Sequence, residues 1–532
     1  TALRDNRKNR IRGTGRKDIS ESLWNFWIDF KKNITFYSSE MVPPFPLRFL
    51  VLPLIFASSG VQLPGAEKSS PPNILHIFVD DLKPLLGTYG APLIQSPNID
   101  RLAAEGLRFD RAFAHVSICG PSRTALMTGL RSSTTRCLTN KDHFRDSVPD
   151  AVTLPQALRA AGYSAYSVGK TFDQRLTDPV SWNGEFMTGL KQDLYVTEEF
   201  NQLYRDNTER YRNASPEARR YLWRVGPPVE KAGAISDHFD GQVAEKAIDL
   251  LSEIPQPFYL AVGFTKPHLP FSAPPAFWDL YDPEAFPLPS PRRRPDDVPL
   301  IGYHEGFELR DYHGVPLRGL VPDAMARELI HGYHASVSFV DALVGQLLEA
   351  LDRLGLRENT IVVLWGDHGF HLGEKEIWCK FTAFQNDTRT PLIVVDPRIE
   401  ARGGTDGIVE AIDIYPTLCE LAGVEAPGNL DGTSFAALLR NPEASGKPAA
   451  LTSVGRGRGW KEFVGTSVYS DGFNYIEWRH RESGRLRTSE LYDLSEDPAE
   501  TKNLADDPEH QETVRRLSRI LEKEYPRDHA ME

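Results

Sequence analysis

Short apolar runs alternate with helical patterns along most of the chain. Runs of consecutive apolar residues typical of buried strands lie at 73–79, 163–168, 258–264, 360–365 and 391–395. Helical spacing of apolar residues is found between or beside them, at 154–161, 244–254, 321–354 and 412–423. This repeated alternation predicts an α/β domain with a large, mainly parallel central sheet flanked by helices.

The alternation breaks in three places. Residues 187–232 are polar and charged and residues 265–320 are rich in proline, so both are expected to be long loops over the sheet edge. From about residue 445 the pattern favours antiparallel strands at 461–469, 473–478 and 489–494 and a closing helix at 508–525. The sequence therefore predicts a main domain at 67–444 and a smaller α+β subdomain at 445–532.

The first part of the chain resembles a targeting segment. Met41 is followed by Arg48, the apolar run 49–57 and small residues up to Ala66. This order predicts a secretory signal peptide at 41–66, with an uncleaved anchor as the alternative, although the run is short for a bilayer span. We expect residues 1–40 to lie upstream of the natural start, and the mature protein to be exported to the periplasm or outside the cell without a membrane span.

Composition narrows the possible functions. The chain has 532 residues, of which 40% are hydrophobic and 25% charged, as in a soluble globular protein, and its net charge is −12. Such a charge argues against nucleic-acid binding, so an anionic ligand must be met by local basic groups. The four cysteines, at 119, 137, 379 and 419, form no CxxC pair, which argues against a zinc ribbon and leaves one disulfide possible.

Charged side chains follow four of the predicted strands. These are Asp80 and Asp81, Lys170, Lys266 with His268, and Asp367 with His368. Each alone is more often a cap or a solvated turn, but carboxyl ends of parallel strands meet at one sheet edge. Three Asp and one His would suit one hard divalent cation, Ca²⁺ or Mg²⁺, while the imidazole leaves Zn²⁺ possible. Nearby Arg123, Lys170, His268 and Lys380 would supply donors to anionic oxygens.

The segment 119–129, CGPSRTALMTG, is the most informative stretch of the chain. Pro121 favours a first helical turn, which places Cys119 at or just before a helix N-terminus, where an anion is favoured. A buried structural cysteine is the alternative. Cys119, Pro121 and Arg123 in this spacing resemble the modification motif of type I sulfatases, in which the cysteine becomes formylglycine, the aldehyde that carries catalysis.

The resemblance extends from Asn73 to about Ala505 and is specific to sulfatases of the iduronate-2-sulfatase-like branch. Besides the Cys119 motif, the matching stretches are 73–75, 79–82, 96–100, 168–170, 266–268, 333–338, 366–369, 490–494 and 497–498. They occur in the order found in that branch, on both the main domain and the C-terminal subdomain.

The resemblance implies an alkaline-phosphatase-like α/β fold, one bound Ca²⁺ and hydrolysis of O-sulfate esters on a carbohydrate, such as a sulfated polysaccharide or a glycosaminoglycan-like oligosaccharide. Formylglycine would be made by a formylglycine-generating or equivalent maturation enzyme. Arg123 and Lys170 would hold the formylglycine and the metal-side oxygens, and His268 and Lys380 would contact the substrate sulfate. The implied metal ligands are Asp80, Asp81, the modified Cys119, Asp367 and His368.

One position departs from the branch, which usually has His three residues after the site lysine. Here that residue is Asp173. Asp173 could act as a base, point away, lie against the metal or impair turnover, and His143 could compensate. Arg310 is a further candidate for substrate binding, with a surface role as its alternative.

Two functional alternatives remain open. A phosphoester hydrolase of the same superfold would typically use Ser or Thr in place of Cys119. A non-catalytic binder of sulfated glycans, impaired by Asp173, would have no need of the intact set of charged residues.

Overall fold

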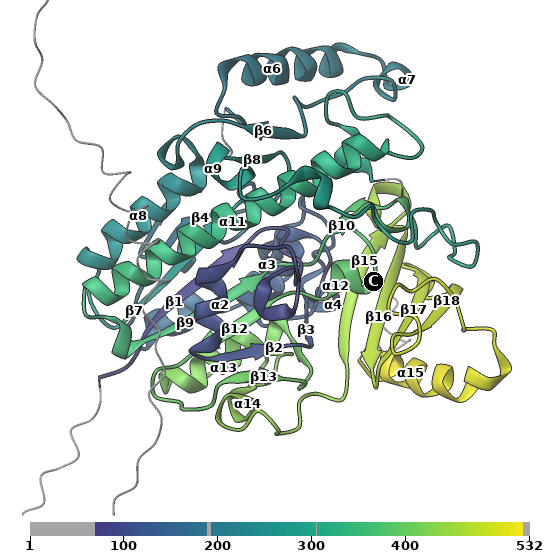
Figure 1. Ribbon diagram of the computed structural model, residues 1–532. Helices are drawn as coiled ribbons and strands as arrows, with labels where there is room; N and C mark the ends of the chain where they lie inside the picture. Colours follow the sequence, from purple (N-terminus) through teal and green to yellow (C-terminus); the bar gives the residue numbers. More distant parts are fainter. Residues whose placement is uncertain (1–69, 189–192, 305, 525–532) are drawn as a thin grey trace, which may run out of the picture. The chain divides into compact units, whose positions relative to one another are not determined.

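An eight-stranded sheet forms the centre of the computed structural model, which describes residues 70–188, 193–304 and 306–524 (Figure 1). The proposed signal peptide and the segment 1–40 lie outside these residues. The strand order is β13 (Gly403–Thr405), β2 (Leu107–Phe109), β12 (Leu392–Val395), β9 (Thr360–Gly366), β1 (Asn73–Val79), β7 (Phe258–Phe264), β4 (Ser164–Gly169) and β5 (Gly184–Phe186). Most neighbours are parallel, whereas β12 runs antiparallel to both β9 and β2. The predicted α/β class is confirmed.

Helices cover both faces of this sheet because its central strands are apolar on both sides. In β1, Leu75, Ile77 and Val79 pack with α2 (Pro97–Ala104), α8 (Phe239–Glu253) and α11 (Asp323–Arg353). Ile74 and Phe78 point to the other face. They pack there with α3 (Cys119–Thr128), α5 (Leu154–Ala160), α13 (Ile414–Ala422) and α14 (Ala436–Arg440).

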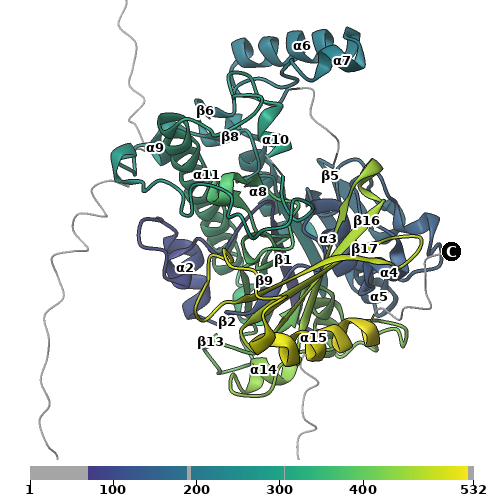
Figure 2. The same cartoon turned by 90° about the vertical axis from the view of Figure 1, so that its right-hand side faces the viewer.

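A second sheet forms the C-terminal part (Figure 2). It is fully antiparallel, in the order β15 (Ala450–Arg456), β16 (Phe463–Ser470), β17 (Phe473–His480) and β18 (Leu486–Asp493). One face packs on α15 (Gln511–Glu524), and Trp478 on the other face packs on residues of the main domain such as Ile377. The C-terminal antiparallel unit is confirmed with one strand more than predicted, while the boundary at 444/445 stays a prediction.

The expectation of long loops at 187–232 was wrong in part. This stretch contains α6 (Glu198–Asn213), α7 (Pro216–Arg219) and β6 (Val229–Lys231) (Figure 1). The apolar period of α6 is weak because it buries chiefly polar side chains, Asn201 and Asn207. Its signal lies in charge: Glu198 and Glu199 are in the first turn and arginines in the last, as the helix dipole favours.

The described residues of the segment 265–320 are mostly irregular, as expected, with only short elements: β8 (Phe271–Ala273), α9 (Pro275–Trp278), the 3-10 helix Pro283–Ala285 and α10 (Phe307–Arg310). Throughout the described ranges, no helix is both long and apolar enough to cross a bilayer. All four cysteines fall inside those ranges and are buried free thiols, so the possible disulfide is not formed.

Candidate active site

Neighbouring strands of the central sheet deliver the candidate residues to one edge. Strands β9, β1, β7 and β4 lie side by side and run parallel, so their carboxyl ends meet there. The side chains that follow these strands are Asp367 and His368, Asp80 and Asp81, Lys266 and His268, and Lys170. The structure therefore brings together the groups that the strand pattern predicted.

Cys119 is the first residue of α3, and Pro121 lies in the first turn, as predicted. Ile118 before it is extended, and every residue of α3 is buried. The Ser122 hydroxyl donates a hydrogen bond to the backbone oxygen of Asp367 over 2.5 Å. This bond ties the N-terminal turn of α3 to the end of β9, so Cys119 is held against the strand edge.

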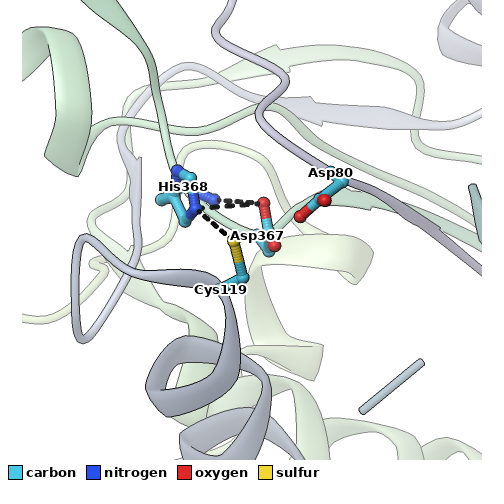
Figure 3. Close-up of side chains that lie close together, drawn as sticks. All are labelled: Asp80, Cys119, Asp367 and His368. Carbon is cyan, nitrogen blue, oxygen red and sulfur yellow. Dashed lines mark hydrogen bonds and ion pairs between the residues drawn. The ribbon is translucent and has the colours of Figure 1, made fainter. Parts of the chain in front are cut away.

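Cys119 lies inside a compact cluster of possible metal ligands (Figure 3). Its Sγ is 3.3 Å from His368 Nε2 and 4.0 Å from Asp81 Oδ1. Two overlapping sets of side chains each place one ligand atom within 4.8 Å of all the others in the set: Asp80, Cys119, Asp367 and His368, and Asp80, Asp81, Cys119 and His268.

This donor set fits one calcium ion. Calcium takes oxygen ligands at about 2.3–2.6 Å, so ligands on opposite sides of one ion lie about 5 Å apart, comparable with the 4.8 Å spread found here. His368 Nδ1 lies 2.8 Å from the backbone oxygen of Gly369, an acceptor, so Nδ1 carries the proton. The other ring nitrogen, Nε2, faces Cys119 Sγ and lies 3.4 Å from Asp81 Oδ1, so it points into the candidate metal site.

Buried cations compensate the carboxylates. Arg123, fully buried, donates from Nε to Asp367 Oδ2 over 2.8 Å and from Nη2 to Asp80 Oδ1 over 3.3 Å. Lys170 forms an ion pair with Asp80, and Lys380 Nζ lies 2.9 and 3.0 Å from the two carboxylate oxygens of Asp81. Burial alone would raise the pKa of Asp80, but Lys170 and Arg123 outweigh it and hold that pKa well below its usual range.

Glu308 joins the two candidate sulfate-binding groups. Its carboxylate is 2.9 Å from His268 Nε2 and 3.1 Å from Lys380 Nζ. His268 Nδ1 lies 2.7 Å from the backbone oxygen of Leu269, so both ring nitrogens face acceptors and both carry a proton. Burial and Lys380 disfavour this charge, but Asp81 and Glu308 outweigh them and raise the pKa of His268.

The Cys119 thiol itself is a poor nucleophile in this setting. Burial and the negative charge of Asp80 raise its pKa well above the usual range. The thiolate is the reactive form of cysteine, so an unmodified Cys119 is neutral and weakly reactive at neutral pH.

Asp173 lies in the site, but its charge is paired. Its carboxylate accepts hydrogen bonds from Arg175 Nε and Nη2 over 2.8 and 3.0 Å. Burial would raise the pKa of Asp173, but these bonds and the charge of Lys170 outweigh it, and the pKa is lowered. Asp173 is therefore ionised, and Arg175 offsets its repulsion of an anionic substrate.

Two further candidates, His143, which could also contact the substrate, and Arg310, lie outside the lining of this site. His143 Nε2 lies 3.3 Å from the backbone oxygen of Thr177, and its ring stacks on Phe144. Arg310 is buried and donates to the backbone oxygens of Pro316 and Gly319. Neither side chain lines the cavity at Cys119, because local backbone acceptors and ring packing hold both elsewhere. The expectation that they bind substrate stays a prediction that this placement does not support.

A cavity of about 620 Å³ opens onto the cluster. Its lining includes Cys119, Lys170, Asp173, His268, Glu308 and Lys380. The cavity is of the size that binds small organic ligands, and its lining combines possible metal ligands with donors for an anion.

The sequence model of the sulfatase family matches residues 72–424. The chain is 32% identical over 431 residues to iduronate 2-sulfatase of Homo sapiens. This alignment covers 73% of this chain and 75% of that protein. The chain belongs to the sulfatase family. It is a hydrolase of sulfuric esters, similar to the iduronate 2-sulfatases.

Solved structures show the same fold. A structure in complex with its substrate, D-glucosamine-2-N,6-O-disulfate, matches with a TM-score of 0.68 and 22% identity over 86% of this sulfatase and 99% of that chain. A phosphonate monoester hydrolase of Agrobacterium radiobacter matches with a TM-score of 0.66 and 22% identity, over 85% of this chain and 95% of that one. Likeness at this identity shows the alkaline-phosphatase-like fold alone, so the sulfatase assignment rests on the family match.

Two charged residues of the sulfatase site were missed from the sequence. In the segment 308–310 we favoured Arg310, whereas it is Glu308 that reaches the cavity. Arg175 was overlooked. It lies two residues after Asp173, the position that departs from the sulfatase branch, and this spacing could have indicated that the charge of Asp173 is compensated.

Proposed function

We propose that this sulfatase hydrolyses O-sulfate esters on a carbohydrate, using a formylglycine made from Cys119 and one bound Ca²⁺. The observation that carries the proposal is the pair of overlapping clusters in which Cys119 meets two carboxylates and one imidazole, with all ligand atoms of a cluster within 4.8 Å of one another. The names of the relatives support a carbohydrate substrate, since one is an iduronate sulfatase and one solved structure holds a sulfated glucosamine.

The chemistry of Cys119 favours modification over direct use. A neutral, buried thiol lacks the thiolate needed for attack. The hydrated aldehyde would supply a hydroxyl nucleophile and a second hydroxyl that allows release of sulfate, and Ca²⁺ would act as a Lewis acid on the sulfate. Asp80, Asp81, Asp367 and His368 would hold the metal, with the modified Cys119 beside it.

The chain's own cations divide into two groups. Arg123 and Lys170 lie on the Asp80 side and keep positive charge beside Cys119. Lys380 and His268 lie on the Asp81 side, where they would bind the ester sulfate, and His268 Nε2–H would donate its proton to the leaving oxygen. Such fixed donors stabilise negative charge as it develops in the transition state.

Maturation and location complete the proposal. A formylglycine-generating or equivalent enzyme would act on the segment 119–129 before folding buries it, because α3 is fully buried in the folded chain. The apolar segment 41–66 supports export to the periplasm or outside the cell, where sulfated polysaccharides are met.

The proposal is tested by sulfate release from defined sulfated oligosaccharides and from 4-nitrophenyl sulfate. We expect turnover by the wild type and none by Cys119→Ala. Phosphate and phosphonate monoesters are assayed in parallel, since preferential cleavage of these esters would favour the alternative hydrolase. Binding of sulfated oligosaccharides without turnover, in protein shown by mass spectrometry to carry the aldehyde, would overturn the catalytic claim.

A further inference from the structure

Three aromatic rings meet at the cavity beside the catalytic cluster. They are Phe307 at the start of α10, Phe381 directly after Lys380, and Trp460 in the turn between β15 and β16. The Trp460 centroid is 5.1 Å from that of Phe307 and 5.0 Å from that of Phe381, and the two Phe rings are 6.5 Å apart. We name these three side chains the aromatic wall.

The aromatic wall keeps apolar surface open to the cavity. Phe307 is 45% exposed, and Phe381 and Trp460 are only partly buried. Exposed aromatic surface is unfavourable in water and gains free energy when a ligand covers it. The neighbouring lining is charged, with His268, Glu308 and Lys380, so a ligand matched to this cavity has one apolar face and one polar or anionic side.

The backbone of the aromatic wall is held in a costly conformation. Phe381 has φ of 82° and Trp460 has φ of 63°, the left-handed region that bulky residues avoid. Each such residue costs about 1–3 kcal/mol and persists where the surrounding structure imposes it, most often at functional sites. The fold therefore holds both rings toward the cavity at a cost in stability.

The aromatic wall is also tied to the sulfate-binding side of the site. Phe307 stacks on His304 at a centroid distance of 4.6 Å, and His304 Nε2 donates to the backbone oxygen of Lys380 over 2.6 Å. Arg456 lies over the Trp460 ring at 5.6 Å and is itself fixed by backbone oxygens such as that of Ile301. Rigid rings lose little conformational entropy on binding a ligand.

We propose that the aromatic wall binds the C–H face of a sugar ring in the sulfated substrate. This inference rests on the proposed function and assigns the residues that recognise the sugar. The positively polarised C–H groups on one face of a pyranose match the negative face of an aromatic ring, while sugar hydroxyls and sulfates would meet the charged lining.

The arrangement fits a sugar better than a quaternary ammonium. A cage for such a cation needs rings that surround an open space. Here the rings contact one another, with interplanar angles of 83° between Phe307 and Trp460 and 62° between Phe307 and Phe381. Their centroids are 5.0–6.5 Å apart, so the rings leave no space between them for a cation, whereas one face of a pyranose chair can pack against their exposed surface.

The test compares saccharide and inorganic sulfate in Trp460→Ala and Phe307→Ala. The wild type is first assayed on 4-nitrophenyl sulfate and on sulfated oligosaccharides from heparin, chondroitin sulfate and ulvan. For the saccharide that it desulfates, each variant is expected to raise KM about tenfold, equivalent to about 1.4 kcal/mol. Inhibition by inorganic sulfate, which needs only the ester site, is expected to change by less than about twofold, well under 1.4 kcal/mol.

Controls separate a binding role from a structural one. Trp460→Phe keeps a ring and should restore most of the affinity for the saccharide. Tyr221→Ala removes an aromatic ring that is 67% exposed and outside the cavity lining, and should leave KM unchanged. Thermal unfolding of each variant reports on folding, and Phe307→Ala, at an exposed position, keeps the test available if Trp460→Ala fails to fold.

The outcomes are distinguishable. Unchanged saccharide KM in both variants overturns the inference, as does a raised KM for choline sulfate with no change for saccharides. Turnover of 4-nitrophenyl sulfate with no saccharide cleaved also overturns it, while the sulfatase assignment stands. No turnover of any sulfate ester by aldehyde-bearing protein refutes the proposed function itself.

Discussion

Replacing Arg123 by Met is expected to destabilise the protein strongly in the absence of calcium. The Arg123 side chain is fully buried and makes hydrogen bonds to Asp367 and Asp80. Met fills a similar volume but leaves two buried carboxylates without this partner. Breaking a buried ion pair in this way costs about 3–5 kcal/mol, a large share of the about 5–15 kcal/mol that keeps a typical protein folded.

The assay is denaturation by guanidinium chloride followed by circular dichroism, in EGTA and in calcium. Calcium bound at Asp80 and Asp367 would replace part of the missing positive charge, and a ligand at 100 times its Kd adds about 2.7 kcal/mol of stability. The loss caused by Arg123→Met should therefore be smaller in calcium than in EGTA. Arg123→Lys keeps the charge without the planar fork and should cost less, which keeps the test available if Arg123→Met does not fold.

Arg145→Met is the matched control, because Arg145 forms an ion pair with Asp178 outside the site. Its loss of stability should be the same in EGTA and in calcium. The reasoning is refuted if Arg123→Met costs less than about 1 kcal/mol, or if its cost does not depend on calcium.

Three further predictions follow from the charged groups. Arg175→Gln exposes the charge of Asp173 to the substrate and should raise KM for a sulfate ester about tenfold; in the double variant with Asp173→Asn, KM should return toward wild type, and no return would argue against charge compensation. Glu308→Gln removes the carboxylate that holds two cations in place and should lower kcat about tenfold or more, measured on the saccharide substrate, whereas unchanged kcat would make Glu308 dispensable. Burial opposes ionisation of Glu374, but Lys83 outweighs it and lowers the pKa of Glu374 from 4.5 to about 2, so its contribution to stability is present above pH 4.5 and is lost as pH falls toward 2. Denaturation measured from pH 7 to 2 should show that Glu374→Gln lowers the free energy of unfolding by up to about 3 kcal/mol at neutral pH. The variant should also lose less stability than the wild type between pH 4.5 and 2, and an equal loss would count against this account.

The sequence predicted the framework of the site because its signals are local. Continuous apolar runs end just before Asp80, Lys170 and Asp367 and four residues before His268, and parallel strands bring such ends to one edge. The start of α3 at Cys119 followed from the position of Pro121.

The features that were not predicted depend on tertiary structure. The antiparallel direction of β12 could not be predicted, because an apolar run is equally compatible with a parallel and an antiparallel strand. Glu308 reaches His268 and Lys380 from an irregular segment, whose path follows no period. The helix α6 buries amides instead of an apolar stripe, so periodicity alone could not reveal it.

The assembly of the aromatic wall also depends on tertiary structure. Phe307, Phe381 and Trp460 come from three segments separated by many residues, and only the packing of the C-terminal sheet on the main domain brings them together.

The central claim is that Cys119 becomes the group that cleaves sulfate esters, and one measurement tests it most directly. Sulfate release from sulfated oligosaccharides is compared between wild type and Cys119→Ala, with the aldehyde at position 119 of the wild type verified by mass spectrometry. The account predicts release by the aldehyde-bearing wild type and none by the variant. Release that survives Cys119→Ala, or no release by protein that carries the aldehyde, would contradict it.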